Sequence, residues 1–166
     1  GKEYITIREE ELHIRSYLEI QQVRYRDILD FGIHISPEIY DYRILKLTLQ
    51  PLVENSLYHG IKYKRAKGKV TVEGRKEGGC IHFSVEDNGV GMDVGELAKL
   101  REEIARPCKE TEKGFGLANV NERIRMNFGM QYGMEIHSVK GEGTRVDITI
   151  PSQRLEKPAR EETENG

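Results

Sequence analysis

Apolar residues recur with two different spacings along the chain, and the change of spacing predicts where helices and strands lie. From about Arg8 to Leu29, apolar or aromatic residues recur every three to five positions between charged ones, which is typical of a helix. This stripe comprises Leu12, Tyr17, Leu18, Gln21, Gln22, Tyr25 and Ile28. Because two glutamines interrupt it, we expect the helix to be only partly buried, as a signalling arm or partner-contact helix rather than a core element.

The next two segments predict a strand and a second helix. Apolar residues from Asp27 to Ile35 indicate a strand that Ser36-Pro37 ends. The strongly apolar segment from about Tyr42 to His59 predicts a helix, with a kink or restart at Pro51 because proline cannot donate a backbone hydrogen bond. Gly60 is a plausible helix stop.

The rest of the chain predicts two hairpins, a lid and one more helix. Alternating strand patterns flank Gly78-Gly79 and Gly141–Gly143. The apolar positions between 115 and 128 fall on one helix face. Between the first hairpin and this helix, the charged and poorly patterned segment 93–113 predicts a mobile lid that is unordered without a ligand. We therefore expect an α+β fold, a two-layer sandwich of one mixed, mostly antiparallel sheet with helices on one face.

Composition narrows the classes of protein and partner. The 166 residues are 37% hydrophobic and 33% charged, with a net charge of −2, which gives no electrostatic reason to expect nucleic acid as a partner. Cys80 and Cys108 form neither a disulfide framework nor a metal-spaced cluster, which favours a reducing compartment. No apolar stretch approaches the roughly 20 residues that span a bilayer. Since the chain begins with Gly rather than Met, we expect a soluble piece of a longer protein.

The first segment with candidate chemistry runs from Leu49 to Gly60, where polar residues interrupt an apolar helix. Asn55 and His59 are four residues apart and therefore share a helix face. The side-chain carbonyl of a buried Asn suits a hard cation such as Mg²⁺. A structural amide beside a hydrogen-bonded histidine is the alternative interpretation.

The second segment runs from Val85 to Met92, where a predicted strand enters a glycine-rich turn. Gly89 and Gly91 permit unusual φ angles and the close approach of a ligand. Asp87, at the end of the strand, is placed to accept a hydrogen bond from a ligand amine, a contact that discriminates strongly against bases lacking that amine. A turn without a ligand is the alternative.

The third segment, Lys113 to Leu117, opens a predicted helix with two glycines. Backbone N–H groups of such a loop at a helix N-terminus form an anion site without a basic side chain. It is not a Rossmann fingerprint, because no strand immediately precedes it and the third glycine is missing. The P-loop and protein-kinase motifs are also absent from the sequence.

In this order and separated by a lid, the three segments resemble the N, G1 and G2 boxes of the GHKL ATPase superfamily, and Gly141–Thr144 resembles its last glycine-containing motif. Segments 49–55 and 116–124, with Tyr17–Gln21 upstream, resemble LytS/YesM-type sensor histidine kinases. The resemblance implies the Bergerat α/β sandwich, ATP and Mg²⁺ as cofactors, and a kinase that phosphorylates a histidine within a homodimer and then passes the phosphate to a response regulator.

The resemblance also implies a role for each site residue. Asn55 would coordinate the Mg²⁺, with Glu54 and His59 close by as further catalytic residues, and Asp87 would receive the adenine amino group, often with a water held by Thr144. The implied cofactor-binding residues are Asn55, His59, Asp87, Gly89, Gly91, Met92, Gly114, Phe115, Gly116, Leu117 and Thr144.

Two departures qualify this expectation, and Pro51 supports the kinase reaction. None of the five histidines lies in a sequence resembling the Asn-Pro-His-Phe of the family's acceptor helix, so we expect the chain alone not to autophosphorylate. Tyr58 stands where relatives commonly carry a basic residue. Pro51 occupies the position of the water-activating glutamate of gyrase-like relatives, which favours phosphoryl transfer over hydrolysis.

The resemblance further implies a division of the chain. Residues 1–30 would end the helical dimerisation region, residues 31–151 would form the catalytic domain, and residues 152–166 would be a disordered tail. We expect a cytoplasmic domain whose parent protein is bound to the bacterial inner membrane. The alternatives are a serine kinase of the anti-sigma-factor kind and a degenerate nucleotide-binding or dimerisation module.

Overall fold

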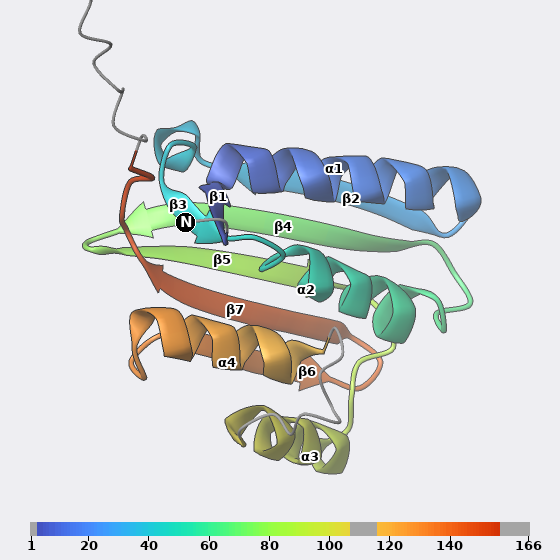
Figure 1. Ribbon diagram of the computed structural model, residues 1–166. Helices are drawn as coiled ribbons and strands as arrows, with labels where there is room; N and C mark the ends of the chain where they lie inside the picture. The colour runs from blue at the N-terminus through green and yellow to red at the C-terminus, as the bar shows by residue number, and fades with distance from the viewer. Residues whose placement is uncertain (1–2, 107–115, 157–166) are drawn as a thin grey trace, which may run out of the picture.

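A five-stranded sheet forms the centre of the protein (Figure 1). The computed structural model describes residues 3–106 and 116–156. The strands of the five-stranded sheet are ordered β2-β4-β5-β7-β6, with β2 parallel to β4 and every other pair antiparallel. They are β2 (Leu29–Ile35), β4 (Gly68–Glu77), β5 (Cys80–Asp87), β6 (Gly133–Val139) and β7 (Gly143–Pro151). The predicted α+β class with a mixed, mostly antiparallel sheet is confirmed.

Helices α1, α2 and α4 lie on one face of this sheet, and α3 lies beyond the edge strand β6 (Figure 1). The helical elements are α1 (Ile7–Arg24), the 3₁₀ turn η1 (Pro37–Ile39), α2 (Gln50–Asn55), the π-helix η2 (Ser56–Ile61), α3 (Val94–Ala105) and α4 (Leu117–Phe128). A small antiparallel sheet joins β1 (Tyr4–Thr6) to β3 (Arg43–Leu45). In the described part of the chain, no helix combines the length and apolar character needed to cross a membrane.

One row of paired apolar residues crosses the sheet and places the core on the helix-covered face. Ile33 pairs with Val72, and Val72 pairs with Val85. Val85 then pairs with Val146, which pairs with Ile136. The last four are almost completely buried. Because side chains alternate between the two faces of a strand, this register directs the neighbouring polar residues to the other face.

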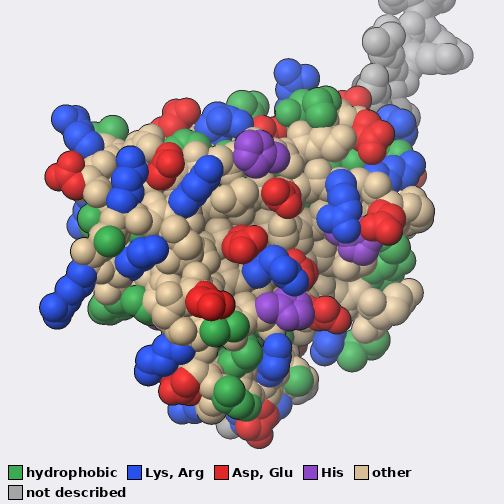
Figure 2. Space-filling model, turned by 180° about the vertical axis from the view of Figure 1, so that it is seen from behind, with side chains coloured by type: hydrophobic (Ala, Val, Ile, Leu, Met, Phe, Trp, Pro, Cys, Tyr) green, Lys and Arg blue, Asp and Glu red, His purple; other side chains and the backbone are tan. Residues whose placement is uncertain are grey.

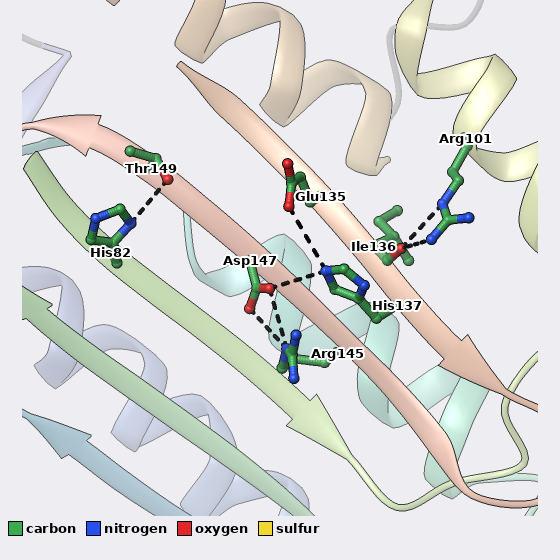
Figure 3. A network of polar contacts seen from close by, with 8 residues as sticks. All are labelled: His82, Arg101, Glu135, Ile136, His137, Arg145, Asp147 and Thr149. Atoms are coloured by element: carbon green, nitrogen blue, oxygen red, sulfur yellow. Dashed lines mark hydrogen bonds and ion pairs between the residues drawn. The ribbon is translucent and has the colours of Figure 1, made fainter. Parts of the chain in front are cut away.

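The opposite face of the sheet carries charged and histidine side chains (Figure 2). Figure 3 shows His137 beside Asp147, with 3.3 Å between Nε2 and Oδ2, and Arg145 on the same carboxylate. On the neighbouring strand, His82 Nδ1 lies 3.1 Å from the Thr149 hydroxyl. This polar surface agrees with the prediction that the helices cover only one face.

Helix α1 is partly buried, as predicted, but its buried face belongs to the core, so the expectation of an arm outside the core is wrong. Thr6 caps the helix by accepting a hydrogen bond from the Glu9 N–H. Starting there, the helix buries Ile7, Ile14 and Leu18 completely, whereas Leu12 of the predicted stripe is 56% exposed. The predicted stripe therefore matches the buried face at Leu18 and misses it at Leu12. The division between residues 1–30 and 31–151 stays a prediction.

The predicted helix from Tyr42 to His59 is two structures. Residues 43–45 form β3, because they pair with β1 at the start of the chain, a contact that local pattern does not reveal. The helix begins at Gln50 with Pro51 in its first turn, where a missing N–H costs nothing, so the predicted restart is confirmed. It continues as a π-helix through Gly60 to Ile61, so Gly60 does not end it.

The predicted lid is a regular helix over most of its described length. Asp93 accepts a hydrogen bond from the Glu96 N–H at 2.8 Å, and the Glu96 side chain accepts one from the Asp93 N–H, which together make a capping box. Leu97 and Ile104 are buried on the inner face of the helix. The prediction of a poorly patterned segment is therefore wrong for residues 94–105. Residues 107–113 lie outside the described part.

The first residues of the predicted disordered tail contact the rest of the domain. The Arg43 N–H donates to the Gln153 carbonyl at 2.7 Å, and the Leu155 N–H donates to the Asp41 carbonyl at 3.4 Å. Residues 153 and 155, which follow β7, are therefore held against the domain. The prediction of a disordered tail is wrong for this first part of the segment. Residues 157–166 lie outside the described part.

Candidate nucleotide-binding site

A cavity of roughly 520 Å³ lies where the end of β5 meets η2, α3 and the start of β7. Its volume falls in the range of small-ligand sites. Residues of three separate predicted segments line it: Asn55, His59, Asp87, Gly91, Met92 and Thr144. The structure thus brings together six of the residues that the sequence assigned to one site.

Asp87 is the buried acid of this cavity. The residue is only 4% exposed, and burial raises the pKa of its carboxyl group. Hydrogen bonds donated by the Gly89 N–H, the Ser56 hydroxyl and the Thr144 N–H act in the opposite direction and favour the carboxylate. A carboxylate has about four acceptor sites, so beside these three donors Asp87 can still accept a hydrogen bond from a ligand amine in the cavity.

Two glycines let the backbone pack directly around Asp87. A Cβ on Gly60 would lie 2.5 Å from Asp87 Oδ1, and a Cβ on Gly143 would lie 2.0 Å from the Asp87 carbonyl oxygen. Gly89 is equally confined, since a Cβ there would lie 2.3 Å from the Gly60 carbonyl carbon. Gly89 therefore acts by letting the backbone pack against η2, and it does not line the cavity itself.

A chain of polar contacts holds the opposite wall. The Met92 N–H donates to the Ser138 hydroxyl at 2.8 Å. The Ser138 hydroxyl lies 2.8 Å from the Thr144 hydroxyl and donates to the Gly143 carbonyl at 2.9 Å. Thr144, paired with Asp87 across β5 and β7, therefore has a fixed hydroxyl beside the carboxylate. Ser138 does not line the cavity but holds Met92 and Thr144, which do, and the sequence analysis missed it.

Asn55 and His59 lie between this cavity and a smaller one of roughly 140 Å³. Both residues line both spaces. The smaller cavity is also lined by Pro51, Glu54, Tyr58, Gly116 and Leu117. Glu54 is oriented by the Gln50 side-chain amide, which donates to its carboxylate at 3.1 Å. Gly114 and Phe115, also predicted to bind the cofactor, lie outside the described residues.

Helix α3 supplies a wall that the sequence analysis did not assign to the site. Tyr63 from the loop after η2 also lines the cavity, together with four residues of α3: Glu96, Lys99, Leu100 and Glu103. Arg101 fixes α3 to the sheet edge, because its guanidinium donates to the Ile136 carbonyl at 2.6 and 3.2 Å (Figure 3). The Asp93–Glu96 capping box was the signal that could have revealed this helix.

Known sensor kinases resemble this chain along most of its length. It is 38% identical over 151 residues to sensor histidine kinase YesM of Bacillus subtilis, covering 90% of this chain and 24% of that protein. It is 32% identical over 149 residues to sensor protein LytS of Bacillus cereus, covering 90% and 25%. The chain thus spans about a quarter of the length of these relatives.

Solved structures share the fold. The catalytic domain of histidine kinase ThkA matches with a TM-score of 0.65 at 17% identity, covering 92% of this chain and 97% of that one. ThkA in complex with response regulator protein TrrA matches with a TM-score of 0.63 at 19% identity, covering 90% and 41%. At these identities the likeness shows the fold, that of a histidine kinase catalytic domain.

The family assignment follows from a match over more than half of the chain. Residues 40–154 match the family described as histidine kinase-, DNA gyrase B-, and HSP90-like ATPase. That range contains the site residues from Asn55 to Thr144 and all of β4 to β7. The chain belongs to this family of ATP-binding domains, the GHKL ATPases, and resembles its YesM- and LytS-type members.

Proposed function

We propose that this chain is the catalytic domain of a sensor histidine kinase that transfers the γ-phosphate of ATP to a histidine outside the chain. The observation that carries the proposal is the position of Asn55 and His59 between a cavity closed by a buried Asp87 and a smaller cavity lined by Gly116 and Leu117. A nucleotide has its base and phosphates at opposite ends, and this arrangement offers one space for each.

Asp87 recognises the base in this proposal. Its carboxylate accepts a hydrogen bond from the adenine amino group, and the Thr144 hydroxyl beside it holds a bridging water or the ring. Guanine carries a carbonyl where adenine carries the amine, so it would face the buried carboxylate with an acceptor. Selection of ATP over GTP therefore follows from the charge of one buried side chain.

The residues near the smaller cavity fit a phosphate-bound Mg²⁺. In the described residues, no three His, Cys, Asp or Glu side chains form a metal site of their own. Mg²⁺ that is held by phosphates and water needs only one or two protein ligands, and Asn55 and Glu54 line the smaller cavity with suitable oxygens. When bound, the ion would neutralise charge on the phosphates.

Phosphoryl transfer rather than hydrolysis is the proposed reaction. A histidine nitrogen forms the new N–P bond, the bond between the γ-phosphorus and the bridging oxygen breaks, and ADP leaves with the electron pair of that bond. Pro51 lies in the first turn of α2, where it can activate no water. His59 and Glu54 remain near the phosphates to orient them and the incoming histidine.

The partners of the proposed kinase follow from its relatives. The acceptor helix would come from another part of the same protein or from a sister subunit of a homodimer. A response regulator would then take the phosphate, as the ThkA complex with the response regulator protein TrrA suggests. A location on the cytoplasmic side of the bacterial inner membrane, where ATP is available, belongs to the same proposal.

Calorimetric titration with a non-hydrolysable ATP analogue tests the proposal. We expect binding to the wild type in Mg²⁺, about a hundredfold weaker binding to Asp87→Asn, and weaker binding of the GTP analogue. Labelled ATP should leave the chain itself unlabelled and should label an added acceptor helix carrying the Asn-Pro-His-Phe sequence. Absence of binding to the wild type would instead support a degenerate module, and labelling of an added serine peptide alone would support a serine kinase.

A further inference from the structure

A buried carboxylate of α1 holds the N-terminus of α2. Glu10 is completely buried. Its Oε1 accepts a hydrogen bond from the Leu49 N–H at 3.0 Å, and its Oε2 accepts one from the Leu47 N–H at 3.4 Å. The first N–H groups of a helix have no partner within the helix. Leu49, at the N-cap of α2, provides no side-chain acceptor, and the first turn of α2 contains no acidic residue. Glu10 therefore supplies, from a different helix, the cap that the local sequence lacks.

Helix α4 holds the loop before α2, residues 46–49, through the carbonyl groups of that loop. The guanidinium of Arg123 donates to the Lys46 carbonyl at 2.6 Å and to the Leu47 carbonyl at 3.1 Å. Leu47 has a φ of +60°, the left-handed region that non-glycine residues rarely adopt. A loop held in this conformation by a carboxylate on its N–H groups and a guanidinium on its carbonyls has little freedom to shift.

The held loop leads directly into the helix with the proposed Mg²⁺ ligand. Residue 49 precedes α2, and α2 ends at Asn55, so a change in the first turn moves the whole helix. Asp87 lies on β5, whereas the hydrogen bonds to Glu10 from Leu47 and Leu49 come from the loop before α2. A disturbance at Glu10 should therefore affect the phosphate end of the site more than the adenine end, where strand pairing on both sides also holds Asp87.

We propose that Glu10 is a positioning residue, which fixes α2 so that Asn55 meets the Mg²⁺ and phosphates of ATP. This inference rests on the proposed function, because it requires that the site binds ATP through Asn55. It assigns α1, which lines neither cavity, a specific role in the phosphate-binding half of the site. This role distinguishes Glu10 from the other core residues. Substitution of one of those residues would weaken both ends of the site equally.

The electrostatics of Glu10 make a clean substitution available. Burial raises the pKa of its carboxyl group, and the backbone N–H groups of Leu49, Leu47 and Gln50 oppose that effect. The neutral side chain is therefore easy to bury. Glu10→Gln has the same shape and can keep the bond from Leu49. Its amide NH₂ would face the Leu47 N–H, however, so one side of the cap is replaced by two opposed donors.

The test compares binding of a non-hydrolysable ATP analogue in Mg²⁺ and in EDTA. For Glu10→Gln we expect about tenfold weaker binding in Mg²⁺, because small displacements of positioning groups have large effects, and a change of less than about twofold in EDTA. The matched control is Glu11→Gln on the same helix. Glu11 is also buried, but it pairs with Arg15 at 3.1 Å rather than with α2. Its two affinities should match those of the wild type.

Hydrogen exchange without nucleotide provides the second readout. Glu10→Gln should accelerate exchange at the amides of residues 47 and 49 and leave the amides of β4 and β5 unchanged, with a melting temperature within about 3 °C of the wild type. Arg123→Gln reaches the same loop from a more exposed side, so it serves as a second variant and should weaken binding only in Mg²⁺ as well.

The two readouts separate the possible failures. Equal weakening in Mg²⁺ and EDTA, or faster exchange with unchanged affinity, would show that Glu10 only stabilises the fold and would overturn the inference. A wild type that binds no nucleotide would overturn the proposed function and with it the role of Glu10 toward ATP. The exchange data would still report whether Glu10 caps α2.

Discussion

At the adenine end of the proposed site, Asp87 is enclosed by backbone, whereas at the phosphate end Gly116 has no described heavy atom within 4 Å of where a Cβ would lie. The first end consists of paired strands and a π-helix in direct contact. The second is a small cavity between two helix ends, and its neighbours Gly114 and Phe115 lie outside the described residues. In the proposed function, recognition of the base therefore depends on the sheet, while phosphate binding depends on how two helices are placed relative to one another.

Gly143→Ala should have the largest effect, because it inserts a methyl group into the closed end. The new Cβ would lie 2.0 Å from the Asp87 carbonyl oxygen, and the φ of +129° is strained for any L side chain. We expect the free energy of unfolding to fall by about 3 kcal/mol or more, measured by urea denaturation.

Gly141→Ala is its matched control. Gly141 also has a positive φ, +86°, but no described atom lies within 4 Å of the position that its new methyl group would occupy. The control should lose only the cost of backbone strain, about 1–2 kcal/mol. Equal losses for both variants would show that the close packing around Asp87 contributes nothing.

Asn55→Ala should separate the two ends by function. We expect the affinity for ATP with Mg²⁺ to fall by about tenfold to a hundredfold, because a polar contact to charged groups is lost. Adenosine, which has no phosphates, should bind as it does to the wild type. Calorimetric titration with both ligands checks this, and a similar loss for adenosine would contradict the division.

Acidification should weaken binding at the adenine end. The pKa of Asp87 is raised by burial, and the proposed contact needs the ionised carboxylate. Adenosine affinity should therefore start to fall at a higher pH than an ordinary Asp would allow, and by about tenfold per pH unit below the pKa of Asp87. Titrations from about pH 7 downward should show the onset above the ordinary pKa of 3.8.

The stability of the protein should respond to Asp87 with the opposite sign. Between the ordinary pKa of 3.8 and its raised value, the folded protein binds more protons at this group than the unfolded chain does. The contribution of Asp87 to stability therefore falls as the pH rises through this window. A comparison of wild type with Asp87→Asn by urea denaturation isolates this contribution, and parallel profiles would exclude it.

Gly116→Ala should have the smallest effect on stability. Its φ of −92° suits any residue, and the described surroundings leave room for a methyl group. We expect a change of less than about 1 kcal/mol in the free energy of unfolding. A larger loss would mean that the phosphate end is packed as closely as the adenine end.

The sequence predicted the sheet better than the elements that depend on distant contacts. The two hairpins follow from alternation and glycine turns, and their register places Thr144 opposite Asp87 as the shared site requires. β3 could not be predicted because three residues carry no pattern and their partner is β1. The proposed role of Glu10 was equally hidden, since the sequence shows three consecutive glutamates and does not reveal which of the buried ones faces the loop before α2.

Of the candidate site, the sequence predicted the residues at the ends of elements and missed the wall that α3 provides. Asp87 and Asn55 stand where a polar residue interrupts an apolar pattern, which is a local signal. Lys99 and Leu100 carry no local signal of a site and reach the cavity because Arg101 and the buried Leu97 and Ile104 place α3. Such contributions depend on packing between elements and need the structure.

The parallel pairing of β2 with β4 has a consequence for how the chain folds. A two-residue turn at 78–79 joins β4 to β5, but Leu29 must find Gly68 across a long crossover. Loop closure of that length makes such contacts slow relative to local hairpins. The crossover contains α2 and η2, so Asn55 and His59 should reach the cavity only in the last stage of folding. Nucleotide binding measured during refolding would then detect only fully folded molecules and no partly folded ones.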